Sequence, residues 1–177
     1  DAIISLNPHK EVRILEKPVL CVMTLARDNA KYVDEYSCCI KSVTDFYLHV
    51  CILENDSTDG TVGLLTKALP ASRIFSMQLG IPRLPGGRTI ERTKKLALLR
   101  NRLTDLADIE CGEFVVVLDT QVKWDPTILK SHVDLLRERP DIAMVTSWGT
   151  VRRSEPCEFH FDTSATIVDG HGPLGFD

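Results

Sequence analysis

Residues 19–26, VLCVMTLA, form a short, continuous apolar run that is rich in branched side chains. A run of this kind is typical of a strand that is buried on both faces of a sheet. Residues 27–43 follow it with apolar side chains at helical spacing, and residues 46–54 form a second strand-like run. The chain therefore opens on a predicted strand, helix and strand.

The same alternation continues along the chain. Further helices are expected over residues 61–69, 88–109 and 126–139. Further strands are expected over 72–79, 114–119 and 142–149, with a strand or two in the tail, which includes 159–170. Helices of this length between strands are typical of βαβ crossovers. We therefore expect an α/β fold in which helices cover both faces of a mostly parallel sheet, as a single domain over residues 1–177.

The composition is that of an ordinary soluble globular protein. Of the 177 residues, 44% are hydrophobic and 26% are charged, and the formal net charge of -4 argues against a nucleic-acid partner. No apolar run is long enough to span a bilayer, and the first residues lack the order of a signal peptide. The six cysteines contain no CxxC pair, which favours buried thiols in a reducing compartment such as the cytoplasm.

Polar segments follow four of the predicted strands. They are residues 25–29, 54–61, 119–124 and 146–150. In an open α/β sheet, ligands bind outside the carboxyl ends of the strands, so we expect these segments to line one crevice. The sequence contains no P-loop, no glycine-rich dinucleotide-binding motif and no nucleophile elbow.

Two acidic residues stand at strand ends. Asp119 ends FVVVLD, where a rigid strand would present its oxygens to a metal ion or a phosphate; the alternative is an aspartate that caps the next turn. Glu54 ends the second strand, although glutamate has poor strand propensity. Turn and helix-cap chemistry is a sufficient explanation for residues 57–61.

Basic side chains gather on the longest predicted helix. Arg88, Arg92 and Lys95 are about one turn apart and are able to share a face, whereas Arg100 and Asn101 belong to a later turn. A diphosphate favours at least one forked cation, which arginine supplies better than lysine. The alternative is a solvated helix face.

Taken in order, these features resemble the catalytic domain of a nucleotide-sugar glycosyltransferase of the GT-A type. In that family the second strand ends in an acid and a turn of the DGSTDGT kind, here ENDSTDGT at 54–61. A helix carries an Arg-Asn pair, here Arg100 and Asn101, and an apolar strand ends in an Asp-x-Asp metal motif, here DTQ at 119–121. The match covers residues 19 to about 150.

A narrower resemblance involves two fragments. LLRNRLTDLA at 98–107 and FDTSATIVDGHG at 161–172 are similar to segments of the fungal capsule-associated mannosyltransferase group.

The family resemblance implies a Rossmann-like GT-A fold and transfer of a sugar from a UDP- or GDP-sugar to a glycan, glycoconjugate or other hydroxyl acceptor. It implies Mn²⁺ or Mg²⁺ at Asp119 and at Gln121, whose neutral amide stands where the family usually has a second acid. The implied donor contacts are Leu25, Ala26, Arg27, Glu54, Asp56, Arg88, Lys95, Arg100, Asn101 and Thr120. Candidates for the catalytic base or nucleophile are Asp162, Asp169 and His171.

Two other functions are open at this stage. A nucleotidyltransferase on a related sheet would need a glycine-rich loop with Arg and Lys after the first strand, and LARDNAKY at 25–32 lacks one. A sugar- or nucleotide-binding module without catalysis is consistent with the amide at Gln121.

Overall fold

The structure is a computed structural model that describes residues 17–83, 89–109, 112–146, 149–152 and 158–161. The chain divides into two compact units, Asp1–Thr127 and Ile128–Asp177. The expectation of one domain over 1–177 stays a prediction.

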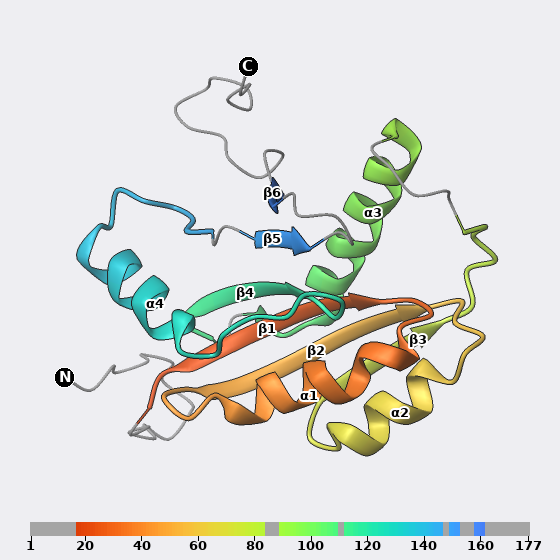
Figure 1. Ribbon diagram of the computed structural model, residues 1–177, viewed down its shortest axis with the longest axis horizontal. Helices are drawn as coiled ribbons and strands as arrows, with labels where there is room; N and C mark the ends of the chain where they lie inside the picture. Colours follow the sequence, from red (N-terminus) through yellow and green to blue (C-terminus); the bar gives the residue numbers. More distant parts are fainter. Residues whose placement is uncertain (1–16, 84–88, 110–111, 147–148, 153–157, 162–177) are drawn as a thin grey trace, which may run out of the picture. The chain divides into compact units, whose positions relative to one another are not determined.

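The first unit is organised around a four-stranded sheet with the order β3-β2-β1-β4 (Figure 1). The strands are β1 (Val19–Ala26), β2 (Tyr47–Asn55), β3 (Arg73–Met77) and β4 (Phe114–Asp119). All three pairings are parallel, and the register places Leu25 of β1 between Leu53 of β2 and Asp119 of β4. The predicted α/β fold with a mostly parallel sheet is confirmed.

Helices connect these strands. They are a 3₁₀ turn (Ala30–Tyr32) that leads into α1 (Val33–Ser42), α2 (Thr61–Ala68) and α3 (Ile90–Leu106). Figure 1 shows α1 and α2 together on one side of the sheet and α3 on the other. The predicted coverage of both faces is therefore confirmed.

One hydrophobic core lies between the sheet and the helices α1 and α2. Val22 and Ile52 of the sheet pack there with Tyr36 of α1 and Leu65 of α2, and all four are almost completely buried. The hydroxyl groups of Tyr36 and Thr24 are hydrogen-bonded at 2.7 Å, which satisfies both polar atoms inside the core.

A second core lies on the opposite face, beneath α3. Cys21 and Leu53 of the sheet pack there with Leu99 and Leu103 of the helix. Successive side chains of a strand point to opposite faces, so β1 and β2 supply both cores from neighbouring positions. This explains why VLCVMTLA has no polar alternation.

β4 is less buried than its sequence suggested. Val115 is 46% exposed and Val117 is 57% exposed, whereas Val116 and Leu118 pack against the first core. β4 is the edge of the four-stranded sheet, and no strand in the described ranges pairs with its outer side. The hydrophobicity of FVVVLD therefore overstated its burial.

The second unit contains α4 (Ile128–Glu138), β5 (Gly149–Arg152) and β6 (Glu158–Phe161). β5 and β6 form an antiparallel pair in which Gly149 lies opposite Phe161. Leu129 and Val133, which are one turn apart on α4, are buried.

The predicted strand over 142–149 is wrong for most of its length. Residues 142–146 have no regular structure, and β5 begins only at Gly149. Met144 is 58% exposed, and no described strand pairs with this segment. An apolar run forms a strand only where a neighbour completes its backbone hydrogen bonds, and sequence periodicity does not report that neighbour.

Within the described ranges, no helix has both the length and the apolar character needed to cross a bilayer.

Candidate functional site

The loops after β1 and β2 are hydrogen-bonded to each other. The backbone N–H of Asp28 donates to Oγ of Ser57 over 2.9 Å, and the backbone N–H of Thr58 donates to Oδ1 of Asp28 over 2.9 Å. The backbone N–H of Asn29 donates to Oγ1 of Thr61 over 2.8 Å. These turn residues thus do more than the turn and cap chemistry predicted for them, because they hold the loop after β1 in place.

Glu54 is buried at the end of β2, with 1% of its surface exposed. Its Oε1 accepts a hydrogen bond from the backbone N–H of Ser57 over 2.7 Å, and its Oε2 accepts one from the hydroxyl of Ser76 over 2.7 Å. Both oxygens are therefore used within the protein. This geometry gives the carboxyl group a role in holding the turn after β2 against β3.

Asp56 holds the loop that follows β3. Its backbone adopts a left-handed conformation with φ of 54°. Oδ1 accepts hydrogen bonds from the N–H groups of Leu79 and Gly80 over 2.7 and 2.9 Å, and Oδ2 accepts one from Ile81 over 3.2 Å. Such a row of backbone N–H groups is a typical anion-binding arrangement, which here binds a carboxylate of the same chain.

Asp56 also helps to position Arg27. Nη1 of Arg27 lies 3.8 Å from Oδ2 of Asp56 and donates a hydrogen bond to the carbonyl of Ile81 over 2.7 Å. Nε of Arg27 is buried and has no hydrogen-bond partner within the described residues. Nε also lies 3.9 Å from Oδ2 of Asp28, so acids of two loops position the guanidinium group at the cavity.

The charge of Asp56 predicts a pH-dependent stability. The hydrogen bond from the Asn55 amide, supported by the three backbone N–H groups and opposed by partial burial, lowers the pKa of Asp56 from 3.8 to about 2. A carboxylate whose pKa is lowered by folding contributes stability that is present above about pH 4 and is lost as the pH falls toward about 2. Urea unfolding of the native protein and of Asp56→Asn should therefore give free energies of unfolding whose difference is constant above pH 4 and shrinks below it.

Asn is a suitable replacement because it tolerates the left-handed conformation. Asp105→Asn, which removes one carboxylate at an exposed position of α3, is the matched control. A difference for Asp56→Asn that stays constant down to about pH 2 would show that the charge of this carboxylate contributes nothing.

The end of β4 is joined to the end of β1 through Asn29. The Asn29 side chain donates a hydrogen bond to Oγ1 of Thr120 and accepts one from the side-chain amide of Gln121, the latter over 2.9 Å. Asn29 is 4% exposed and Thr120 is 3% exposed. The sequence placed Asn29 in one of the polar segments expected to line the crevice, but it did not predict these hydrogen bonds, because both partners lie about 90 residues further along the chain.

One face of α3 carries a row of positive charge. Arg92, Lys95 and Arg100 recur at intervals of three and five residues, with Leu96 and Leu99 between them at helical spacing. Nζ of Lys95 donates a hydrogen bond to the carbonyl of Pro82 over 2.9 Å. Residues 94, 101 and 102 belong to the exposed part of the helix that does not line the cavity described next.

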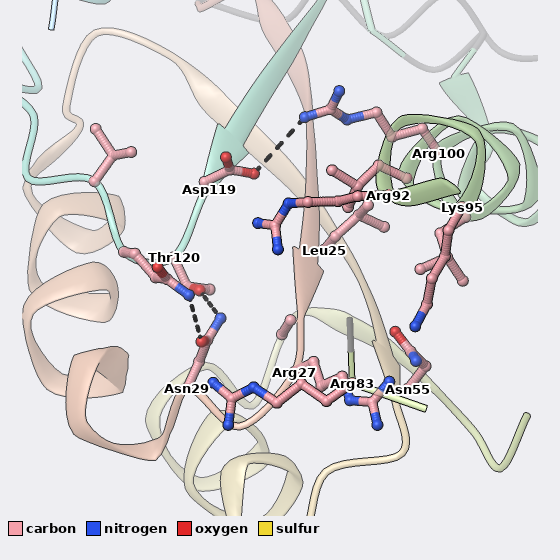
Figure 2. A pocket seen from close by; sticks show the side chains of 15 residues that line it. Leu25, Arg27, Asn29, Asn55, Arg83, Arg92, Lys95, Arg100, Asp119 and Thr120 are labelled. Carbon is pink, nitrogen blue, oxygen red and sulfur yellow. Dashed lines mark hydrogen bonds and ion pairs between the residues drawn. The ribbon is translucent and has the colours of Figure 1, made fainter. Parts of the chain in front are cut away.

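These elements enclose a cavity of about 420 Å³ at the carboxyl ends of the strands (Figure 2). Its lining comprises Leu25, Ala26, Arg27, Asn29, Asn55, Arg83, Arg92, Lys95, Leu96, Leu99, Arg100, Asp119, Thr120, Gln121 and Val122. Five of these side chains are cationic and one is a carboxylate. Figure 2 shows Arg92 and Arg100 extending from α3 toward the side of Asp119, and Arg27 and Arg83 at the opposite end. The arrangement suits a multiply charged anion.

The structure brings together most of the predicted site. The predicted residues that line the cavity are Leu25, Ala26, Arg27, Lys95, Arg100, Asp119, Thr120 and Gln121. Glu54, Asp56 and Asn101 do not line it, and Arg88, Asp162, Asp169 and His171 lie outside the described residues. Asn29 and Asn55 belong to the polar segments expected to line the crevice but were not named among the donor contacts. Arg83 lies outside those segments, and the basic loop composition around it was the available signal.

Neither a scan against protein-family models nor a search of curated proteins finds a match to this chain. Among solved structures, the chain is similar to residues 1–349 of S. aureus TarS in complex with UDP-GlcNAc, with 21% identity and a TM-score of 0.48 over 68% of this chain and 32% of that TarS chain. It is also similar to glucosyl-3-phosphoglycerate synthase from Mycobacterium tuberculosis in complex with Mn²⁺, UDP and glucosyl-3-phosphoglycerate. There the identity is 17% and the TM-score 0.44, over 67% of this chain and 39% of the synthase.

The chain thus spans well under half of the length of these structures, and its function has to be inferred from its own cavity. The narrower resemblance to fungal capsule-associated mannosyltransferases has no counterpart in these comparisons and stays a prediction.

The oxygen donors at the end of β4 do not fit a preformed site for Mn²⁺ or Mg²⁺. Such sites are composed mainly of carboxylates, phosphate oxygens and water. Here Asp119 is the one carboxylate among the lining residues, and its Oδ1 lies 3.9 Å from Nη2 of Arg100. Gln121 offers a neutral amide, and within the described ranges no three His, Cys, Asp or Glu side chains cluster in a way that would hold a metal ion. Metal binding by Asp119 and Gln121 therefore stays a prediction.

Proposed function

We propose that this chain is the donor-binding part of a glycosyltransferase that moves a sugar from a UDP- or GDP-sugar to a glycan, glycoconjugate or other hydroxyl acceptor. The observation that supports this most is the position of the cationic cavity. It lies at the carboxyl ends of β1, β2 and β4. Because β2 and β4 flank β1 on opposite sides, the strand order reverses at β1, which is where open α/β sheets bind nucleotides.

The charges of the cavity suggest how a donor lies in it. The diphosphate would face α3, where Arg92 and Arg100 supply forked donors and Lys95 a third positive charge. The nucleoside would lie toward Arg27 and Asn55, at the ends of β1 and β2. Leu25 and Ala26 would contact it through apolar and backbone groups.

Two predicted donor contacts take a different role in this proposal. Glu54 and Asp56 would act as positioning residues: Glu54 holds the turn after β2, and Asp56 holds the loop after β3 together with Arg27. Asn55, which lies between them in the chain, lines the cavity instead.

The same cations would assist the chemical step. When the bond between the anomeric carbon and the diphosphate breaks, its electron pair passes to the diphosphate oxygen, and nearby guanidinium groups stabilise the charge that develops there. The acceptor hydroxyl oxygen bonds to the anomeric carbon and loses its proton to a base. Asp162, Asp169 and His171 are proposed for that base or for a nucleophile.

Calorimetric titration with UDP, GDP and their sugars tests the proposal. One of the two nucleotides and its sugar should bind at a single site, because the cavity has room for one diphosphate donor. Lack of binding by every one of these ligands would refute the proposal. Release of free nucleotide on incubation with donor and acceptor then separates a transferase from a module that only binds.

A further inference from the structure

We propose that the diphosphate of the donor binds directly to the cationic side chains of this cavity, and that its binding does not need a divalent metal ion. This inference rests on the proposed function and specifies how the same site holds its ligand. Three cations on one face of α3 carry it: Arg92, Lys95 and Arg100.

The two cations at the far end of the cavity are already close to acids. Nη1 of Arg27 lies 3.8 Å from Oδ2 of Asp56, and Nη1 of Arg83 lies 3.6 Å from Oδ2 of Asp28. Neither acid lines the cavity. Part of the charge of Arg27 and Arg83 is thus balanced by acids outside the cavity.

The cations on α3 are not balanced in this way. Nη2 of Arg100 lies 3.9 Å from Oδ1 of Asp119, the single carboxylate among the residues that line the cavity. Within the part of the chain that the structure describes, Arg92 and Lys95 make no ion pair with a carboxylate. Two positive charges therefore face the cavity without an acidic partner, and a diphosphate is the ligand that would pair with them.

These cations also repel one another. Burial, followed by the positive charges of Arg27 and Arg92, lowers the pKa of Lys95 against an opposing effect of Asp56. Bringing a diphosphate into the cavity would relieve this repulsion and strengthen binding. A divalent cation beside Asp119 would increase the repulsion among these positive charges, and it would compete with Arg100 for the carboxylate of Asp119.

The geometry of α3 suits direct binding. Arg92 and Arg100 are two turns apart, about 12 Å along the helix axis. Their long side chains extend toward the same space near Asp119 (Figure 2). Forked guanidinium groups that converge from two turns can bond oxygens of both phosphates, which is the charge neutralisation that a metal ion supplies in other sites.

The test is calorimetric titration of the whole chain with UDP and with GDP, once with EDTA and once with saturating Mn²⁺ or Mg²⁺. For the nucleotide that binds, we expect the dissociation constants in the two conditions to agree within about threefold. Lys95→Ala should weaken binding about tenfold in EDTA, whereas Lys94→Ala, its exposed neighbour outside the cavity, should change it less than about twofold.

The outcomes separate the two proposals. Binding only in the presence of metal, or binding more than about tenfold tighter with it, overturns direct cation binding and leaves the proposed function standing. Lack of binding in both conditions overturns both. An equal loss of nucleotide affinity in Lys95→Ala and Lys94→Ala would also contradict the inference. It would show that the overall charge of the helix, and not the lining of the cavity, determines binding.

Discussion

The double substitution Arg92→Ala/Arg100→Ala is expected to weaken nucleotide binding by about 100-fold or more, the largest effect on binding that the cavity predicts. Each arginine supplies a charge-assisted, forked contact to a phosphate, and such a contact contributes about 1.5 to 3 kcal/mol. Titration with the nucleoside diphosphate that the native protein binds measures the loss directly. Because both side chains are exposed on α3, the fold should tolerate their removal.

The matched control is Lys94→Ala/Arg102→Ala. It also removes two positive charges from α3, but neither residue lines the cavity. Long-range attraction alone would weaken binding by less than about threefold at physiological salt. Similar losses in the two double variants would show that α3 acts through its overall charge, and the assignment of Arg92 and Arg100 as direct contacts would have to be abandoned.

Glu54→Ala is expected to lower the free energy of unfolding by about 3 kcal/mol, since it removes the acceptor of two hydrogen bonds at a buried position. The backbone N–H of Ser57 and the hydroxyl of Ser76 would lose their partner, and a cavity would replace the side chain. Chemical denaturation followed by circular dichroism measures the effect.

Glu54→Gln separates the structural role of this residue from direct nucleotide contact. The amide oxygen can still accept from Ser57, and the amide N–H can donate to the Ser76 hydroxyl, which is able to accept as well as donate. We expect stability within about 1 kcal/mol of the native protein and unchanged nucleotide affinity. If Glu54→Gln folds normally but binds nucleotide more than about tenfold more weakly, the side chain contacts the ligand, as its sequence position first indicated.

Most of the first unit could be predicted from local patterns. Apolar runs rich in branched residues at β1 and β2 differ clearly from the helical spacing of α1 and α3, because a strand buried on both faces alternates its side chains between two cores. The carboxyl ends of parallel strands lie at one edge, so Arg27, Asp119 and Thr120 could be assigned to one site from their positions after the predicted strands.

The errors have a common physical origin. Residues 142–146 and β4 are apolar, but a strand and its burial depend on neighbours that come from elsewhere in the chain. The hydrogen bonds of Asn29 could not be predicted for the same reason, because its partners Thr120 and Gln121 follow another strand, about 90 residues along the chain.

The sequence by itself determined the alternation of strands and helices, the parallel sheet and the edge at which polar side chains gather, since these follow from periodicity and connection length. Only the tertiary structure decided what each of those polar side chains does. At the end of β2 it turned Glu54 inward onto Ser76 and left Asn55 to line the cavity, because alternate residues of a strand face opposite ways and only packing decides which face is covered. On α3 it turned toward the cavity the face that carries Arg92 and Lys95, together with Arg100 of a later turn, because helical spacing groups residues on a face but only packing decides which face meets the sheet.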